Sequence, residues 1–368
     1  MRLFDKRIIS HFDYLLLIFV LPLVFLSHHL ISETNEILAK KQLIYFSISL
    51  FAFAFVFILP IRKKLRLIPF LYWVGIALLL AVEFWGVTKL GAKRWLPVPI
   101  LNTTMQPSEL IKPIYILMLG YLIHNRPPPK NGYGLKDFIY FSFYILLPFI
   151  LIAKEPDLGT ALVMLLVGYG ILFIIGVNWK IWATIVLSIG LASPLIYTYL
   201  IKDYQKKRIK DFISEKPSYH VQQSIIAIGS GGLVGKVSED ATQTQLKFLP
   251  IATSDFIFAY FVERYGFLGA LGLIFIYALL IMHLLSMNYY YKDDYVIRCF
   301  ASGLALLIFL NMSVNILMVI GFAPVVGLPL PLFSYGGSSF INFVVIFAIL
   351  ENLLAFRYMD MYNYERRL

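Results

Sequence analysis

The run LGTALVMLLVGYGILFIIG, residues 158–176, has no charged side chain and determines the fold class of this chain. A helix needs roughly 20 apolar residues to cross a hydrocarbon core about 30 Å thick. Other apolar stretches long enough to cross lie at 13–30, 42–61, 67–88, 108–123, 137–154, 179–201, 254–287, 297–322 and 335–357. The sequence therefore predicts an all-α polytopic membrane protein with about ten transmembrane helices.

The composition agrees with a lipid environment and excludes several other classes of protein. Of 368 residues, 60% are hydrophobic and 14% are charged, and the mean hydropathy is +0.77. We expect one transmembrane domain over residues 1–368. The net charge of +11 does not indicate nucleic-acid binding, because most basic residues lie in short loops between apolar runs. Cys299 is the only cysteine, which excludes an internal disulfide and a cysteine-based metal cluster.

The distribution of basic residues predicts the orientation. Lysine and arginine concentrate in the short loops around 62–66 and 126–136 and near the C-terminus, which places both termini in the cytoplasm. The first apolar run lacks a small-residue cleavage site after it, so we expect it to remain as a span. The segment 202–253, between spans seven and eight, is then a long extracellular loop. Its basic, amphipathic beginning suits a helix on an anionic lipid surface.

Glu109 and Lys112 are three residues apart at the start of the fourth span and can pair on one helical face. A structural ion pair is one interpretation, and contact with a charged substrate is the other. Pro107 suits a first helical turn, while Gln106 or Ser108 can cap the helix or face a cavity.

Arg94 and Trp95 lie in the outer loop before that span. The guanidinium of Arg94 matches phosphate oxygens, and Trp95 can stack on a sugar. A snorkelling arginine beside an interfacial tryptophan explains them equally well.

Glu155 and Asp157 place two carboxylates in a tight outer turn between two spans. They can bind a metal ion or hold neighbouring loops by hydrogen bonds. Asp157 as the N-cap of the sixth span is the simpler interpretation.

The glycine-rich stretch 229–236 superficially resembles a phosphate-binding loop. It has Ser230 and Val237 where such a loop needs glycine and serine or threonine, and no strand-to-helix context. A flexible hinge is the better interpretation.

Asp255 opens the predicted eighth span, where it can act as a helix cap or as a general base. Before the last span, 327–331 and 334–339 form a polar, breaker-rich interruption that includes Ser338 and Ser339. Within a membrane, such backbone is tolerated only beside a cavity or inside protein.

Taken in order, six segments resemble the SEDS family of cell-wall polymerases: GAKRW (91–95), QPSELIK (106–112), EPDLGT (155–160), QQSIIAIGSGGL (222–233), DFIFAYFVERYGFLGA (255–270) and PVVGLPLPLFSYGGSS (324–339). The short N-terminus is more similar to the elongation member RodA than to the division member FtsW. The chain departs from the family pattern at Thr253 and Ser254, where many members have histidine and threonine. It departs again at Glu263 and Arg264, where they have paired glutamates, and at Lys236 and Val237.

The resemblance implies a peptidoglycan glycosyltransferase that polymerises lipid II at the outer face of the bacterial cytoplasmic membrane during elongation and shape maintenance. Asp255 would be the general base. Arg94 and Lys112, alone or with a divalent cation such as Mg²⁺ or Mn²⁺, would offset charge on the pyrophosphate. The expected substrate-binding residues are Arg94, Trp95, Gln106, Ser108, Glu109, Lys112, Ser338 and Ser339.

No organic cofactor is expected. The partners that the resemblance implies are nascent glycan, a class B penicillin-binding protein transpeptidase and the elongation machinery. Two alternatives stay open: a lipid II flippase, for which inverted repeats would be typical but none is seen, and a catalytically silent scaffold.

Overall fold

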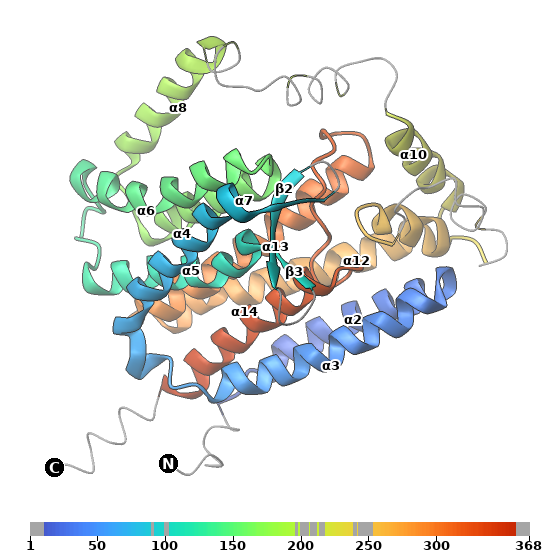
Figure 1. The fold of residues 1–368 in the computed structure, drawn as a ribbon, viewed down its shortest axis with the longest axis horizontal. Coiled ribbons are helices and arrows are strands. Elements are labelled where there is room, and N and C mark those ends of the chain that lie inside the picture. The colour runs from blue at the N-terminus through green and yellow to red at the C-terminus, as the bar shows by residue number, and fades with distance from the viewer. Residues whose placement is uncertain are drawn as a thin grey trace.

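The computed structural model describes residues 11–89, 92–98, 103–195, 218–237 and 253–357, with the isolated positions 198, 206, 212 and 241. Its elements, labelled in Figure 1, run in this order: α2 (Tyr14–Thr34), α3 (Glu36–Ile58), η1 (Arg62–Leu67), α4 (Ile68–Trp85), β1 (Val87–Lys89), β2 (Ala92–Val98), β3 (Thr103–Met105), α5 (Pro107–Asn125), α6 (Leu135–Lys154), α7 (Leu158–Ile175), α8 (Trp179–Leu195), α10 (Tyr219–Gly231), α12 (Ile257–Tyr290), α13 (Tyr295–Val319) and α14 (Gly337–Ala355).

The predicted helical membrane fold is confirmed over the described residues. Eight helices are long and apolar enough to cross a membrane: α2, α3, η1 with α4, α6, α7, α12, α13 and α14. The other two predicted spans coincide with α5 and with α8, which is described over 17 residues. Much of the predicted loop 202–253, including its amphipathic beginning, lies outside the described residues, but α10 occupies part of it.

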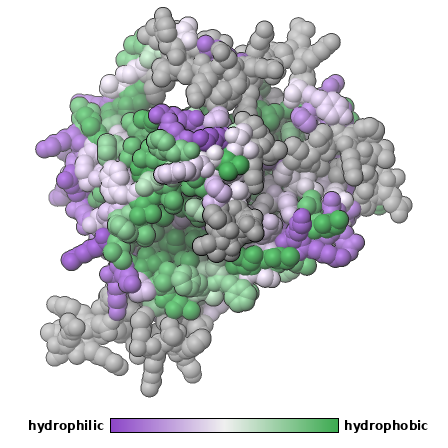
Figure 2. Space-filling model, in the orientation of Figure 1, coloured by the Kyte–Doolittle hydropathy of each residue, from purple (hydrophilic) through white to green (hydrophobic). Residues whose placement is uncertain are grey.

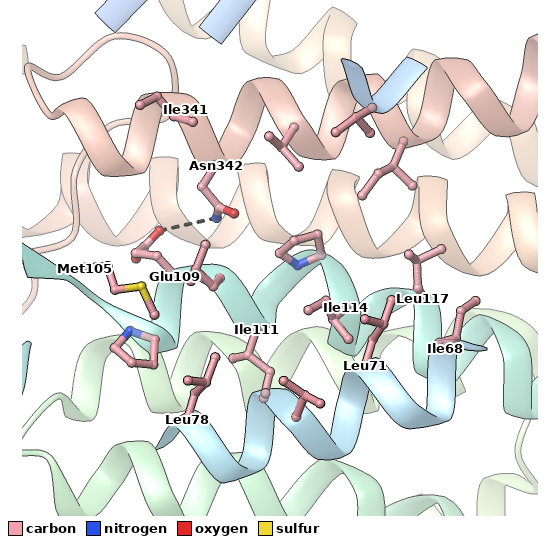
Figure 3. A pocket seen from close by; sticks show the side chains of 18 of the residues that line it. Ile68, Leu71, Leu78, Met105, Glu109, Ile111, Ile114, Leu117, Ile341 and Asn342 are labelled. Carbon is pink, nitrogen blue, oxygen red and sulfur yellow. Dashed lines mark hydrogen bonds between the residues drawn. The ribbon is translucent and has the colours of Figure 1, made fainter. Parts of the chain in front are cut away.

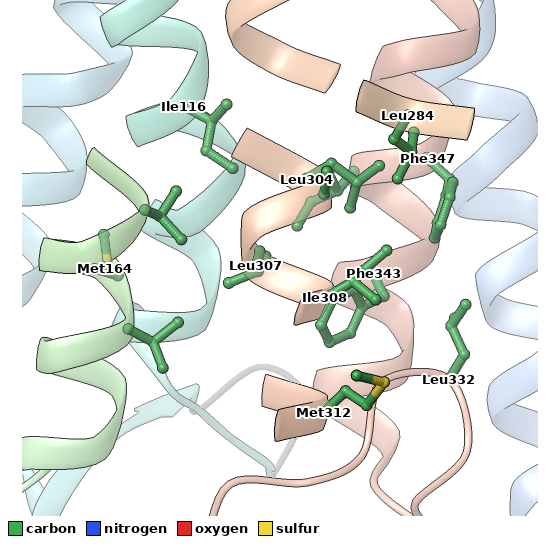
Figure 4. Close-up of a cluster of buried hydrophobic side chains, with 14 of the residues drawn as sticks. Ile116, Met164, Leu284, Leu304, Leu307, Ile308, Met312, Leu332, Phe343 and Phe347 are labelled. Atoms are coloured by element: carbon green, nitrogen blue, oxygen red, sulfur yellow. The ribbon is translucent and has the colours of Figure 1, made fainter. Parts of the chain in front are cut away.

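The centre of the bundle is built around α5 and α13. α13 packs against α5, α7, α12 and α14. In Figure 4, Leu304, Leu307 and Ile308 of α13 lie between Met164 of α7 on one side and Phe343 of α14 on the other. α5 is covered by other helices along most of its length, so it tolerates polar residues that a lipid-facing helix would not.

The first residues of α2 and the last turn of α14 meet at one end of the bundle. The backbone N–H of Asp13 donates to Glu351 Oε2 at 3.1 Å, and His283 Nε2 lies 2.6 Å from Asp13 Oδ2. At this end, Arg62 also pairs with Asp294, and its Nε donates to the carbonyl of Leu353.

The segment before α5 forms a small antiparallel sheet in the order β1-β2-β3, which the sequence did not predict. Val87 stands opposite Trp95, and Leu96 stands opposite Met105. The pattern analysis placed 87–88 of β1 at the end of the predicted span 67–88 and Arg94 and Trp95 of β2 in a loop, because β1 and β3 have only three residues each and are too short to show a period of two. The sheet carries Arg94 on β2, and β3 leads directly into α5.

α12 is interrupted by Gly266, which has φ +67° and ψ −167°. A Cβ there would collide with the backbone of Leu233 and Gly235, so only glycine permits this approach. The stretch 232–236 is held by hydrogen bonds to both sides of the break: Lys236 N–H donates to Glu263 O at 3.0 Å, and Phe267 N–H to Gly232 O at 2.9 Å. The stretch 232–236 is therefore bonded to both halves of α12, and the flexible hinge stays a prediction.

Candidate functional site

Arg94, Gln106, Ser108 and Asp157 form one polar network where β2, the start of α5 and the start of α7 meet. Arg94 Nη1 lies 3.2 Å from Asp157 Oδ2, and Gln106 Nε2 donates to the same oxygen at 3.1 Å. Gln106 Nε2 also donates to Ser108 Oγ at 3.0 Å. Asp157 Oδ1 accepts from the backbone N–H of Thr160 at 3.2 Å, so the predicted N-cap of this span is confirmed.

Glu155 lies beside this network in the turn between α6 and α7. Its side chain is buried, and neither carboxylate oxygen has a hydrogen-bond partner among the described residues. Burial, reinforced by the charge of Asp157 and opposed by that of Arg94, raises the pKa of Glu155 to about 8. At neutral pH this residue is therefore chiefly a protonated carboxylic acid.

Glu109 and Lys112 form the predicted ion pair, with Lys112 Nζ 2.5 Å from Glu109 Oε1. Lys112 is buried, and Glu109 Oε2 also accepts from Asn342 Nδ2 of α14 at 3.3 Å. Pro107 occupies the first turn as expected, and Gln106 takes the N-cap position without a side-chain capping bond. Glu109 thus joins α5 to α14 through Asn342, while its pair with Lys112 lies within α5.

A groove of about 720 Å³ runs between α4, α5 and α14, with the end of α3 at its border. Figure 3 shows apolar side chains of α4 and α5, such as Leu71, Leu78 and Ile114, facing Ile341 and Asn342 of α14 across it. Gln106, Glu109 and Ser338 lie at its polar end. The space-filling view shows a hollowed, largely apolar surface on this face (Figure 2).

Lys64, from η1, also lines this groove. η1 lies directly before α4 in the chain, and β1 lies directly after it. The groove therefore starts near the η1 end of α4 and extends along the helix toward the β1 end. Its shape suits a long apolar chain whose polar head lies near Glu109.

Asp255 lies in a turn before α12, and that turn is held by α13 and by the breaker-rich segment before α14. Asn315 Nδ2 of α13 donates to the backbone carbonyls of Asp255 at 2.9 Å and Leu328 at 2.7 Å. Ser334 Oγ donates to the carbonyl of Ser254 at 2.7 Å. The carboxylate faces the breaker-rich segment, because a Cβ on Gly327 would lie 3.5 Å from Asp255 Oδ2.

The interpretation of Asp255 as a helix cap is wrong. α12 begins at Ile257 with Phe256 at the N-cap position, and no side chain caps it. Burial raises the pKa of Asp255, while the positive charge of Arg94 opposes that rise. A carboxylate with a raised pKa is a stronger base than an exposed one.

The remaining expected residues are placed as follows. Trp95 lies on β2, and Ser338 and Ser339 lie in the first turn of α14. Ser338 and Glu109 line the groove, whereas Lys112 is not among the residues that line it. Sequence reasoning missed Asn315 and Asn342, although an asparagine inside an apolar span is a recognisable signal.

The described residues contain no group of three or more histidine, cysteine or acidic side chains that could hold a metal ion. Asp157 already accepts from Arg94, Gln106 and Thr160. Glu155 and Asp157 are two carboxylates and do not by themselves amount to such a group.

Comparison with known proteins gives a full-length match. The family described as "Cell cycle protein" (FtsW, RodA, SpoVE) matches residues 2–359. The chain is 54% identical over 359 residues to the peptidoglycan glycosyltransferase MrdB of Helicobacter pylori (strain ATCC 700392 / 26695), covering 98% of this chain and 94% of that protein.

Solved structures agree with the sequence relatives. A chain from a peptidoglycan synthase complex that coordinates polymerization and crosslinking matches with a TM-score of 0.81 at 28% identity, over 95% of this chain and 99% of that one. The rod shape determining protein RodA of Thermus thermophilus matches with a TM-score of 0.71 at 26% identity, over 94% of this chain and 98% of that one.

Proposed function

Because the chain belongs to the FtsW/RodA/SpoVE family, we propose that it is a RodA-type peptidoglycan glycosyltransferase that polymerises lipid II during cell elongation. The similarity extends along nearly the whole length of a relative that is named peptidoglycan glycosyltransferase. The chain is accordingly a multi-span membrane protein. We propose that both termini are cytoplasmic and that Arg94, Gln106 and Asp255 lie at the outer face.

The observation that carries the proposed chemistry is the position of Arg94. It pairs with Asp157, and its charge also acts on Asp255 and Glu155. A basic side chain beside a carboxylate of raised pKa suits a reaction in which a hydroxyl loses a proton near a pyrophosphate.

In the proposed reaction, the 4-hydroxyl oxygen of the acceptor sugar forms a bond to C1 of the lipid-linked glycan. The bond from C1 to the lipid pyrophosphate breaks, the pyrophosphate takes the electron pair, and Asp255 accepts the hydroxyl proton. Arg94 offsets the negative charge that develops on the leaving group. A Mg²⁺ or Mn²⁺ ion, if bound with the substrate, would offset the same negative charge on the pyrophosphate.

The groove supplies a place for the lipid. Its apolar walls suit the polyprenyl tail, and its polar end at Glu109, Asn342 and Gln106 suits the head group. We propose Gln106, Ser108, Ser338 and Ser339 as head-group contacts and Trp95 as a sugar contact. Lys112 is the least favoured of the proposed contacts, because Glu109 already holds its ammonium group.

The crosslinking partner is also a proposal. Polymerised strands need a transpeptidase, and the chain resembles one from a synthase complex that coordinates both activities. We propose a class B penicillin-binding protein and the elongation machinery in that role.

The test is polymerisation by purified Asp255→Asn protein supplied with lipid II alone. Asparagine keeps the size of the side chain, and Asp255 caps no helix, so the melting temperature should stay close to that of the unmodified protein. Loss of a general base should lower the rate by about 10²–10⁴-fold. Normal polymerisation by this variant would refute the base assignment.

The same preparation separates the alternatives. Glycan chains from the unmodified protein identify a polymerase, lipid II movement without chains identifies a flippase, and neither outcome identifies a scaffold. For orientation, a cysteine at the exposed position Tyr219 should react in intact cells, whereas Cys299 is buried. Reaction only after permeabilisation would reverse the proposed topology.

A further inference from the structure

The residue proposed as the base is attached to a short helical piece rather than directly to the long span. The break at Gly266 separates residues 257–265 from the remainder of α12, and Asp255 lies in the turn just before this piece. Because the helix is broken at Gly266, contacts with other elements help to set the orientation of this buried piece. In the sequence, this piece lies between Asp255 and the break at Gly266.

One ion pair holds this piece to α2. Arg264 presents two nitrogens to one carboxylate: Nη2 lies 2.7 Å from Glu33 Oε1, and Nε lies 2.8 Å from Glu33 Oε2. The hydroxyl of Tyr260 donates to Glu33 Oε2 at 2.8 Å. A bidentate arginine–carboxylate pair fixes orientation as well as distance, which a lysine cannot do.

The same guanidinium reaches the loop that fills the break. Arg264 Nη1 donates to the carbonyl of Lys236, and the N–H of Lys236 donates to the carbonyl of Glu263. Arg264 thus connects α2, the short piece and the stretch 232–236. His29 is a further titratable group at Glu33, beside Tyr260 and Tyr265, with its Nε2 3.4 Å from Glu33 Oε1.

We propose that Glu33 and Arg264 are positioning residues that hold the piece 257–265, and through it Asp255, at the orientation needed for proton transfer. This inference rests on the proposed function of Asp255. Both side chains are largely buried, Glu33 at 15% and Arg264 at 12% exposed, so solvent competes weakly with the pair. A pair that only anchored two helices would contribute stability without affecting the turnover of folded protein.

The chain contains a matched control. Arg62 and Asp294 form an ion pair of similar burial, with side chains 20% and 12% exposed, at the end of the bundle where Asp13 and Glu351 meet. Asp294→Asn removes the negative charge of the control pair, as Glu33→Gln removes the negative charge of the pair with Arg264. Each variant keeps the size of the side chain, and asparagine can still cap α13 at position 294.

The experiment compares Glu33→Gln, Arg264→Gln, Arg264→Lys and Asp294→Asn as full-length purified proteins. The first two should lower kcat by about ten- to a hundredfold, because small misplacements of reacting groups cost that much, and should leave KM for lipid II within about twofold. Arg264→Lys should lose less than Arg264→Gln. Asp294→Asn should lower the melting temperature similarly while its kcat stays unchanged.

Hydrogen exchange of the amides in 256–261 gives a readout independent of activity. Exchange there should accelerate in Glu33→Gln and not in Asp294→Asn. Equal turnover per folded molecule in Glu33→Gln and Asp294→Asn, or unchanged exchange at 256–261, would overturn the positioning role. Asp255→Asn is assayed in parallel: an active Asp255→Asn refutes the base assignment, while the exchange data still decide whether Glu33 and Arg264 hold the segment.

Discussion

Arg94 of β2 and Asp157 at the start of α7 form an ion pair with their nearest polar atoms 3.2 Å apart. These residues are far apart in the sequence, and the pair ties the small sheet to the helical bundle. The charge of the same arginine also lowers the pKa of Asp255 against the effect of burial. Arg94 therefore links the contact between the sheet and α7 to the ionisation of the proposed base.

Replacing Arg94 with glutamine should move the pH dependence of polymerisation. Removing the positive charge raises the pKa of Asp255 further, so a higher pH is needed to ionise it. The acidic limb of the kcat profile should shift to higher pH, in addition to any fall in the maximum rate. Measured profiles with unchanged acidic limbs in Arg94→Gln and the unmodified protein would show that Arg94 does not act on the base.

Glu155 should make the stability of the protein depend on pH. The folded pKa of about 8 lies above the ordinary value of 4.5. Below about pH 4.5, Glu155 is protonated in both the folded and the unfolded protein, so its ionisation does not destabilise the fold. The loss of folding stability grows as the pH rises and reaches its full size above about pH 8, because ionising the buried group costs about 1.4 kcal/mol per unit of pKa difference. The melting temperature should fall between these limits.

Glu155→Gln removes this titration while keeping the shape of the side chain. Its melting temperature should vary less between pH 5 and 8 than that of the unmodified protein, and it should melt higher at pH 8. Glu36→Gln is the control, because Glu36 is exposed and its ion pair with Lys40, at 2.7 Å, is exposed as well. Parallel curves for Glu155→Gln and the unmodified protein would contradict the assignment of a protonated Glu155.

The pair formed by Glu109 and Lys112 should be strongly coupled. Lys112→Met alone leaves Glu109 with one fewer partner in a buried setting and should destabilise by about 3–5 kcal/mol. Combining it with Glu109→Gln removes the unpaired charge and should recover most of that loss. Melting temperatures of the singles and the double form the cycle.

Turnover in the double variant tests the ligand role. If Lys112 serves only its pairing with Glu109, the stable double variant should polymerise at a rate close to normal. A well-folded double variant without activity would instead assign a substrate contact to the pair. Additive losses of stability would contradict the coupling.

Filling the groove should weaken lipid binding. Val345 lines the groove from α14, and Val345→Trp should raise KM for lipid II by about tenfold, because the larger side chain would occupy space that the lipid tail needs. Phe70→Trp is the control, because Phe70 is exposed on α4 and is not part of the lining. Equal KM values in the two variants would remove the groove from the proposed lipid path.

The sequence by itself determined the membrane fold and most of its spans, because each span needs a run of apolar residues whatever its neighbours are. It also determined local pairs close in the sequence: Glu109 with Lys112, and Asp157 with the N–H of Thr160. These interactions depend on helical periodicity and capping, which act over three or four residues.

Only the tertiary structure decided which distant residues meet. The partners of Arg94, Glu109 and Arg264 are Asp157, Asn342 and Glu33, and no periodic pattern connects them. The break at Gly266 depends on the backbone of neighbouring residues that lie close to it, so the sequence pattern did not predict it. The start of α12 without a side-chain cap was likewise visible only in the structure. A span is set by transfer of its own side chains into lipid, whereas a site is set by contacts between elements, whose relative positions depend on packing of the whole bundle.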